Sequence, residues 1–107
     1  MVEVLKFSGD FDSLIETDKE MLRDFFMNFY SKAKMKLSNE ISLEFVIKNY
    51  KEFGKSKKYT INFRLIAPTN ILRVSATEWD LKKVIHKASD KMLNEIEGKF
   101  HVSNQHG

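Results

Sequence analysis

Three lysines recur at intervals of four residues in the C-terminal third of the chain: Lys83, Lys87 and Lys91. In an α-helix this spacing stacks the three ammonium groups along one face, and no acidic residue falls within the row. Like charges at this spacing repel each other, so the row weakens an isolated helix slightly. An anionic partner makes such a row useful, because lysine ammonium groups act as point charges that bind phosphates. The row is therefore a candidate polyanion-binding surface.

Residues that support catalysis in other proteins do not gather into a recognisable site here. His86 lies beside the lysine row rather than in a carboxylate cluster, and His101 and His106 lie close to the C-terminus. The absence of cysteine excludes thiolate nucleophiles, zinc–thiolate sites and disulfides together. No glycine-rich phosphate loop, paired-histidine metal motif or nucleophile elbow is present, and the acidic residues between positions 10 and 20 lack metal-loop spacing. We expect a protein that is not an enzyme and that uses neither metal nor cofactor.

Basic residues concentrate in the middle of the chain. Residues 1–31 contain three basic and seven acidic side chains, residues 32–73 contain ten and three, and residues 74–107 contain five of each. A local excess of positive charge is typical of proteins that contact nucleic acid or another polyanion. The candidate RNA-binding residues drawn from this segment and from the helical row are Lys34, Lys55, Lys57, Lys58, Lys83, Lys87 and Lys91.

Helical periodicity appears in two segments that would position these lysines. Thr17 and Glu20 form a candidate capping box, in which the Thr oxygen accepts from a free backbone amide and the Glu side chain reaches back. The aromatic stripe that follows predicts a helix of about five turns with its phenylalanines facing the core. The second helix is predicted after Thr77–Asp80. The expected core stripes are Leu22, Phe25, Phe26, Phe29 and Ala33 in the first helix, and Leu81, Val84, Ile85, Ala88, Met92 and Ile96 in the second.

Between the two helical segments the apolar period changes to two, which is typical of strands with one buried face. A weakly alternating strand is also predicted at residues 2–7, before the first helix. Residues 51–58 form a polar connection with Gly54 as its turn residue, and Pro68–Asn70 predicts a tight turn. The expected buried rows are Ile41, Leu43, Phe45 and Ile47; Tyr59, Ile61, Phe63 and Leu65; and Leu72, Val74 and Ala76.

These elements predict an α+β fold with the order β-α-β-β-β-α, in which two helices pack on one face of a four-stranded, mostly antiparallel sheet. We expect one domain over residues 1–100 and a flexible tail over residues 101–107. The chain lacks a run of about 18 apolar residues, and its first residues lack the layout of a secretory signal. The expectation is therefore a cytoplasmic protein that does not enter a membrane.

The end of the domain resembles the ribosome-hibernation-promoting factors, also described as ribosome-associated inhibitors or sigma-modulation-like proteins. Their β-α-β-β-β-α domain ends in a Leu-Arg-Ala-Ser strand and a helix patterned D-x-x-x-x-I-x-x-A-x-D-K-Φ-x-x-x-Φ, where Φ is apolar. The topology matches over essentially the whole domain, and the residues match over about the last thirty positions. The matching residues are Leu72-Arg73-Val74-Ser75, then Asp80, Ile85, Ala88, Asp90, Lys91, Met92 and Ile96.

The resemblance implies a stress-related translation inhibitor that binds small-subunit rRNA near the decoding channel through basic residues on its helices, and that blocks tRNA and mRNA binding. Lys91 is the basic position that matches the family pattern directly. Lys83 and Lys87 stand where the family usually has apolar or neutral residues, and Lys82 stands where it usually has tyrosine. The helix is thus kept while its surface differs from the family pattern.

A second hypothesis is a small regulatory module that acts through self-association, for example as a homodimer, or through ligand binding at the sheet face. Its candidate surface includes Trp79, Tyr50, Phe53 and Tyr30. A continuous positive surface across both helices would favour the RNA hypothesis. An apolar outer sheet face with balanced charge on the helices would favour protein association.

Overall fold

The computed structural model describes residues 4–38, 40–52 and 56–100. Its elements follow the predicted β-α-β-β-β-α order, with one additional 3-10 turn, η1, after the first strand. Their bounds are β1 (Leu5–Gly9), η1 (Asp10–Ser13), α1 (Glu16–Leu37), β2 (Ser42–Glu52), β3 (Ser56–Ile66), β4 (Ile71–Glu78) and α2 (Leu81–Phe100).

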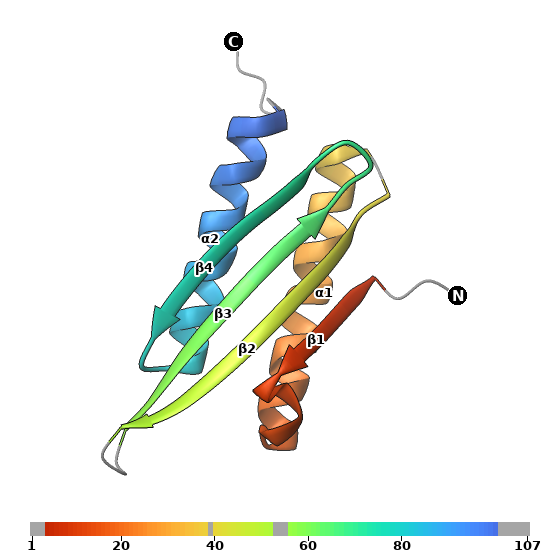
Figure 1. Ribbon diagram of the computed structural model, residues 1–107. Coiled ribbons are helices and arrows are strands. Elements are labelled where there is room, and N and C mark those ends of the chain that lie inside the picture. The colour runs from red at the N-terminus through yellow and green to blue at the C-terminus, as the bar shows by residue number, and fades with distance from the viewer. Residues whose placement is uncertain (1–3, 39, 53–55, 101–107) are drawn as a thin grey trace.

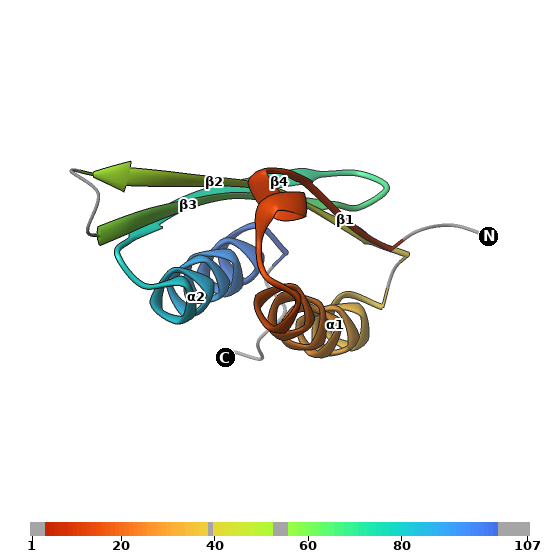
Figure 2. The same cartoon turned by 90° about the horizontal axis from the view of Figure 1, so that it is seen from below.

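The four strands form one sheet in the order β1-β2-β3-β4 (Figure 1). β1 runs parallel to β2, whereas β2 with β3 and β3 with β4 are antiparallel. Because the chain returns to β2 only after α1, a parallel first pair follows from the helical crossover between them. The prediction of a mostly antiparallel sheet is confirmed. Both helices cover the same face, and no described residue forms a layer over the other face (Figure 2).

The core lies between the sheet and the helices and is centred on phenylalanines. Phe26 of α1 has its ring centroid 4.2 Å from that of Phe45 and 5.2 Å from that of Phe63. Phe45 and Phe63 face each other across β2 and β3 with centroids 4.5 Å apart. All members of the predicted core rows are buried except Phe25 and Val74, which are half-buried and pack against the core. The periodicities in the sequence thus identified the core faces correctly.

The predicted capping box at the start of the first helix is wrong. α1 begins at Glu16 with Ile15 as its N-cap, and no side chain caps it. Phe11 and Leu14 are buried just before this point, so the chain enters the helix directly from an anchored 3-10 turn. Glu16 and Asp18 lie in the first turn, where negative charge interacts favourably with the free amides.

The hairpin between β2 and β3 is longer than predicted. Its backbone pairing continues to Glu52 opposite Ser56, through most of the predicted polar connection. Polar side chains extend the ladder here because the strand hydrogen bonds are made by the backbone. The first strand lies at Leu5–Gly9, so the predicted residues Val2 and Glu3 and the tail 101–107 fall outside the described residues. The Pro68–Asn70 turn is confirmed by the Ala67 amide, which donates to the Asn70 carbonyl at 2.9 Å.

Tyr59 provides a prediction for alkaline pH. It is buried on the helix-facing side of β3, and burial, aided by the nearby carboxylates of Asp18 and Asp80, raises the pKa of its hydroxyl above the ordinary value. The folded protein therefore keeps this proton where the unfolded chain loses it. The stability that this raised pKa contributes is intact below about pH 10 and is lost as the pH rises through the folded-state pKa. Urea denaturation at increasing pH above about 10 should show a smaller decline in stability for Tyr59→Phe than for the parent; equal declines would contradict this.

Candidate nucleic-acid interface

The lysine row lies on the solvent-facing side of α2. Asp80 starts this helix: its Oδ1 accepts from the Lys82 amide at 2.9 Å, and its carbonyl accepts from the Val84 amide at 3.0 Å. Beginning at Leu81, the helix turns its apolar stripe toward the sheet. The side chains of Lys83, Lys87 and Lys91 are consequently all exposed.

Two of the three lysines contact the neighbouring edge strand. Lys87 Nζ lies 3.0 Å from Glu78 Oε2, and Lys91 Nζ donates to the Ser75 carbonyl at 2.7 Å. Lys83 makes no ion pair with any residue that the structure describes. Ion pairs this exposed contribute about 0–1 kcal/mol, so an incoming phosphate can compete for these ammonium groups.

A shallow groove runs beside the row, between the end of β4 and α2. It adds Lys82, an exposed side chain that the sequence-based candidates did not include, although its place next to Lys83 was a visible signal. His86 also lines the groove, and its ring packs edge-on against Phe25 of α1 with centroids 5.0 Å apart. The groove is lined by Glu78, Asp80, Lys82, Lys83, His86, Lys87 and Asp90. Since both signs of charge are present, it can hold a phosphate only on the lysine side.

Lys34 lies on α1, apart from the row on α2. Its ammonium is 3.6 Å from Glu40 Oε2 and lies over the Tyr30 ring at 5.9 Å. α1 as a whole contains five basic and four acidic residues, and α2 contains five and three. The two helices therefore do not form a continuous positive surface. On α2 the positive charge is concentrated in the lysine row.

Three of the predicted lysines belong to the β2–β3 hairpin, and the structure describes two of them. Lys58 lies on β3, on the face opposite the helices, with its ammonium 5.6 Å from the centroid of the Trp79 ring. Lys57 is also part of β3, where it is paired with Lys51, and Lys55 lies outside the described residues. The structure thus brings together Lys83, Lys87 and Lys91, but neither Lys34 nor Lys58 joins them.

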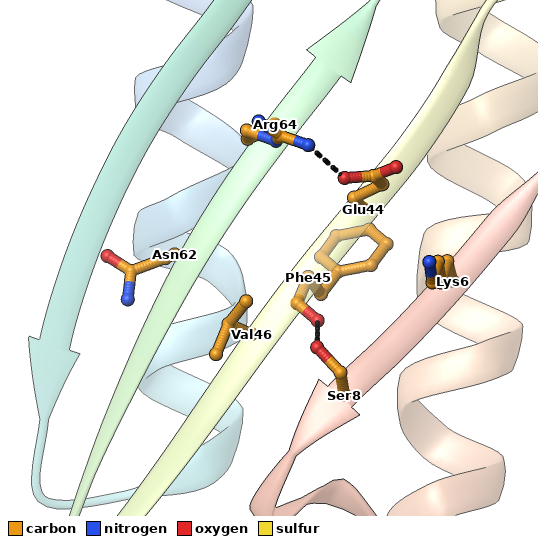
Figure 3. Close-up of a pocket in the computed structure, with 7 residues that line it drawn as sticks. All are labelled: Lys6, Ser8, Glu44, Phe45, Val46, Asn62 and Arg64. Carbon is orange, nitrogen blue, oxygen red and sulfur yellow. Dashed lines mark hydrogen bonds and ion pairs between the residues drawn. The ribbon is translucent and has the colours of Figure 1, made fainter.

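A second set of basic residues was missed by the sequence analysis. These side chains alternate with the buried rows of the strands and therefore project from the uncovered face, which we call the open sheet face. They come from all four strands. Glu44 lies on the same face and pairs with Arg64 (Figure 3). The basic residues of the open sheet face are Lys6, Lys48, Lys58, Arg64 and Arg73. The sequence signal for these residues was their alternation with the buried positions of each strand. They do not cluster in any one segment.

The described residues contain no group of three or more His, Cys, Asp or Glu side chains that could hold a metal ion. Across the same part of the chain, neither helix has the combination of length and apolarity that crossing a bilayer requires.

Comparison with known proteins finds solved structures with this fold, of which two are described. The Thermus thermophilus Protein Y N-terminal domain superposes with a TM-score of 0.66 at 17% identity, over 92% of this chain and 98% of that one. A ribosomal subunit interface protein from Coxiella burnetii gives a TM-score of 0.53 at 15% identity, again over 92% and 98%. No protein-family model and no curated protein sequence matches the chain. At these identities the likeness shows a shared fold, and this fold is consistent with the family resemblance seen in the sequence.

Proposed function

We propose that this protein is a non-enzymatic, cytoplasmic ribosome-binding factor that contacts small-subunit rRNA through the lysine row of α2 and thereby inhibits translation. The proposal rests on the agreement between a sequence motif and a structural comparison. The residue motif from Asp80 to Ile96 resembles hibernation factors, and the backbone fold, compared without reference to that motif, resembles a protein named for the ribosomal subunit interface.

The α2 surface is suited to this role. Lys83, Lys87 and Lys91 present three exposed ammonium groups along about two turns of one helix, and Lys82 adds a fourth at its start. Lys87 and Lys91 are held by Glu78 and the Ser75 carbonyl, so their positions are partly fixed before RNA arrives. Contacts of this kind recognise the position of phosphates rather than base sequence. A factor that occupies a folded RNA channel needs shape and charge of this kind.

Neutralising the row is expected to remove most of the salt-dependent affinity. The variant Lys83→Gln/Lys87→Gln/Lys91→Gln should weaken binding to isolated small subunits at low salt. It should also lower the slope of log K against log salt by about one for each phosphate that the variant no longer neutralises. Co-sedimentation with small subunits at several salt concentrations measures both quantities.

A matched control has the same change in net charge at the other end of the helix layer: Lys32→Gln/Lys36→Gln/Lys99→Gln. Two of these lysines lie in the last turns of α1, where the helix dipole already explains their presence. We expect this control to sediment like the parent. Failure of the parent to co-migrate at low salt would exclude ribosome binding, and equally weakened binding in both variants would exclude the lysine row as the binding surface.

The self-association hypothesis gains no support from the two surfaces it would use most directly. Five basic side chains on the open sheet face would repel those of a second copy placed against it. Lys91 donates to the Ser75 carbonyl of the edge strand β4, and lysines at sheet edges oppose pairing with another strand. A homodimer therefore stays an untested prediction.

A further inference from the structure

The open sheet face combines positive charge with exposed aromatic rings. Its basic residues are Lys6, Lys48, Lys58, Arg64 and Arg73, and Glu44 is its one acidic residue among those whose side chains the structure describes. The two helices together have a basic excess of three residues, and this face, counted over its described side chains, has an excess of four. Positive charge therefore also gathers on the side that no helix covers (Figure 2).

Two aromatic side chains stand at one end of this face, on either side of a lysine. Tyr50 of β2 lies opposite Lys58 of β3 in the strand register, and the Lys58 ammonium lies 5.6 Å from the centroid of the Trp79 ring. The exposed fractions are 48% for Tyr50 and 54% for Trp79. About half of each residue is therefore in contact with solvent, and packing against the core does not explain why an aromatic residue stands at either position.

A hollow lies farther along the same face, where β1, β2 and β3 run side by side (Figure 3). Lys6 and Arg64 stand on either side of it, and Ser8 and Asn62 contribute polar groups. The Ser8 hydroxyl donates to the Phe45 carbonyl, and Arg64 is held by Glu44. Arg64 is six positions along β3 from Lys58, so the surface from the aromatic end to the far side of the hollow spans about 20 Å. This length accommodates several nucleotides of an extended strand.

We propose that the open sheet face binds single-stranded RNA, with bases stacking on Tyr50 and Trp79 and phosphates held by Lys48, Lys58, Arg73 and Lys6. Exposed rings set among basic side chains are the combination that single-stranded nucleic acids require, because every base has a π-face and every linkage carries a charge. A duplex presents its phosphates but keeps its bases stacked inside, so it can contact the basic side chains of this face but cannot stack a base on the rings. The inference concerns the opposite face from the α2 lysine row and does not rest on the proposed ribosome binding.

Trp79 supplies a direct measurement, since it is the only tryptophan of the chain. Stacking of a base on its indole should quench its fluorescence when a decauridylate is titrated in. In parallel, fluorescence anisotropy of labelled decauridylate should give a Kd that rises about tenfold or more in Tyr50→Leu and in Trp79→Leu. For the parent, log K should fall with log salt at the slope expected of a single strand, which is shallower per phosphate than that of a duplex.

Tyr30→Leu is the matched control. Tyr30 also lies beneath a lysine, with Lys34 Nζ 5.9 Å from its ring centroid, but it belongs to α1 on the other side of the molecule. It should change the Kd by less than about twofold. The Lys83→Gln/Lys87→Gln/Lys91→Gln variant should still show quenching of Trp79, which separates this surface from the proposed ribosome contact.

Three results would overturn the inference. One is unchanged affinity in both Tyr50→Leu and Trp79→Leu, verified as folded by circular dichroism. Another is a ten-base-pair RNA duplex that binds as tightly as decauridylate, which would leave only phosphate contacts. The third is self-association of the parent in sedimentation velocity that disappears in the Tyr50→Leu variant without any RNA binding, which would assign the face to protein contact.

Discussion

Replacing Phe26 with alanine is expected to lower the free energy of unfolding by about 3–5 kcal/mol. Phe26 is fully buried, and its ring contacts both Phe45 and Phe63, the residues that join β2 to β3 on the helix-facing side. Alanine would leave a cavity where α1 meets the sheet. Domains of this size usually have a total stability of about 5–15 kcal/mol, so this one change removes a large share of it.

Thermal unfolding followed by circular dichroism measures the destabilisation, which should appear as a fall of roughly 15–25 °C in the midpoint. Met27→Ala is the control, because the next residue along α1 is 47% exposed and should change stability by less than about 0.5 kcal/mol. A midpoint for Phe26→Ala within a few degrees of the Met27→Ala value would show that Phe26 does not hold the helix on the sheet.

Gly9→Ala is expected to lower the free energy of unfolding by about 3 kcal/mol. Gly9 ends β1 with φ +73° and ψ −129°, a combination that L side chains rarely adopt. A methyl group added there would also overlap the backbone carbonyl oxygen of Ile47 in the paired strand β2. Since that oxygen belongs to the backbone, the overlap can be relieved only by separating β1 from β2.

Gly98→Ala is the matched comparison. Gly98 lies in α2, and an added methyl group would have nothing within 4 Å. Alanine favours the helix over glycine by about 0.5–1 kcal/mol, so this variant should be more stable than the parent. Urea titration of the two variants should give changes of opposite sign. Equal or same-signed changes would contradict the role assigned to the Gly9 backbone.

The elements of the fold were largely predictable because each has its own local signal. The change of apolar period from 3.6 to two and back marks where helix gives way to strands, and the buried side of each element follows from the same positions. The predicted helix start was wrong because a tertiary contact outweighed a local sequence preference. Thr17 and Glu20 match a capping box, but the burial of Phe11 and Leu14 fixes the chain before them and starts α1 at Glu16.

The lysine row of the candidate site was predictable for the same reason. Residues four apart in a helix share a face whatever surrounds that helix, so Lys83, Lys87 and Lys91 had to lie together. Their partners were not predictable. Glu78 and the Ser75 carbonyl belong to β4, and only the packing of α2 along that edge strand brings them to Lys87 and Lys91.

The sequence by itself determined the types of elements, the inward face of each, and the existence of a basic α2 surface, because all three follow from spacings within single segments. Only the tertiary structure decided that Lys6, Lys48, Lys58, Arg64 and Arg73 share the open sheet face. These residues lie on four strands, and their proximity depends on strand order and register. Register is set by how the buried rows pair across the sheet, which no single segment encodes.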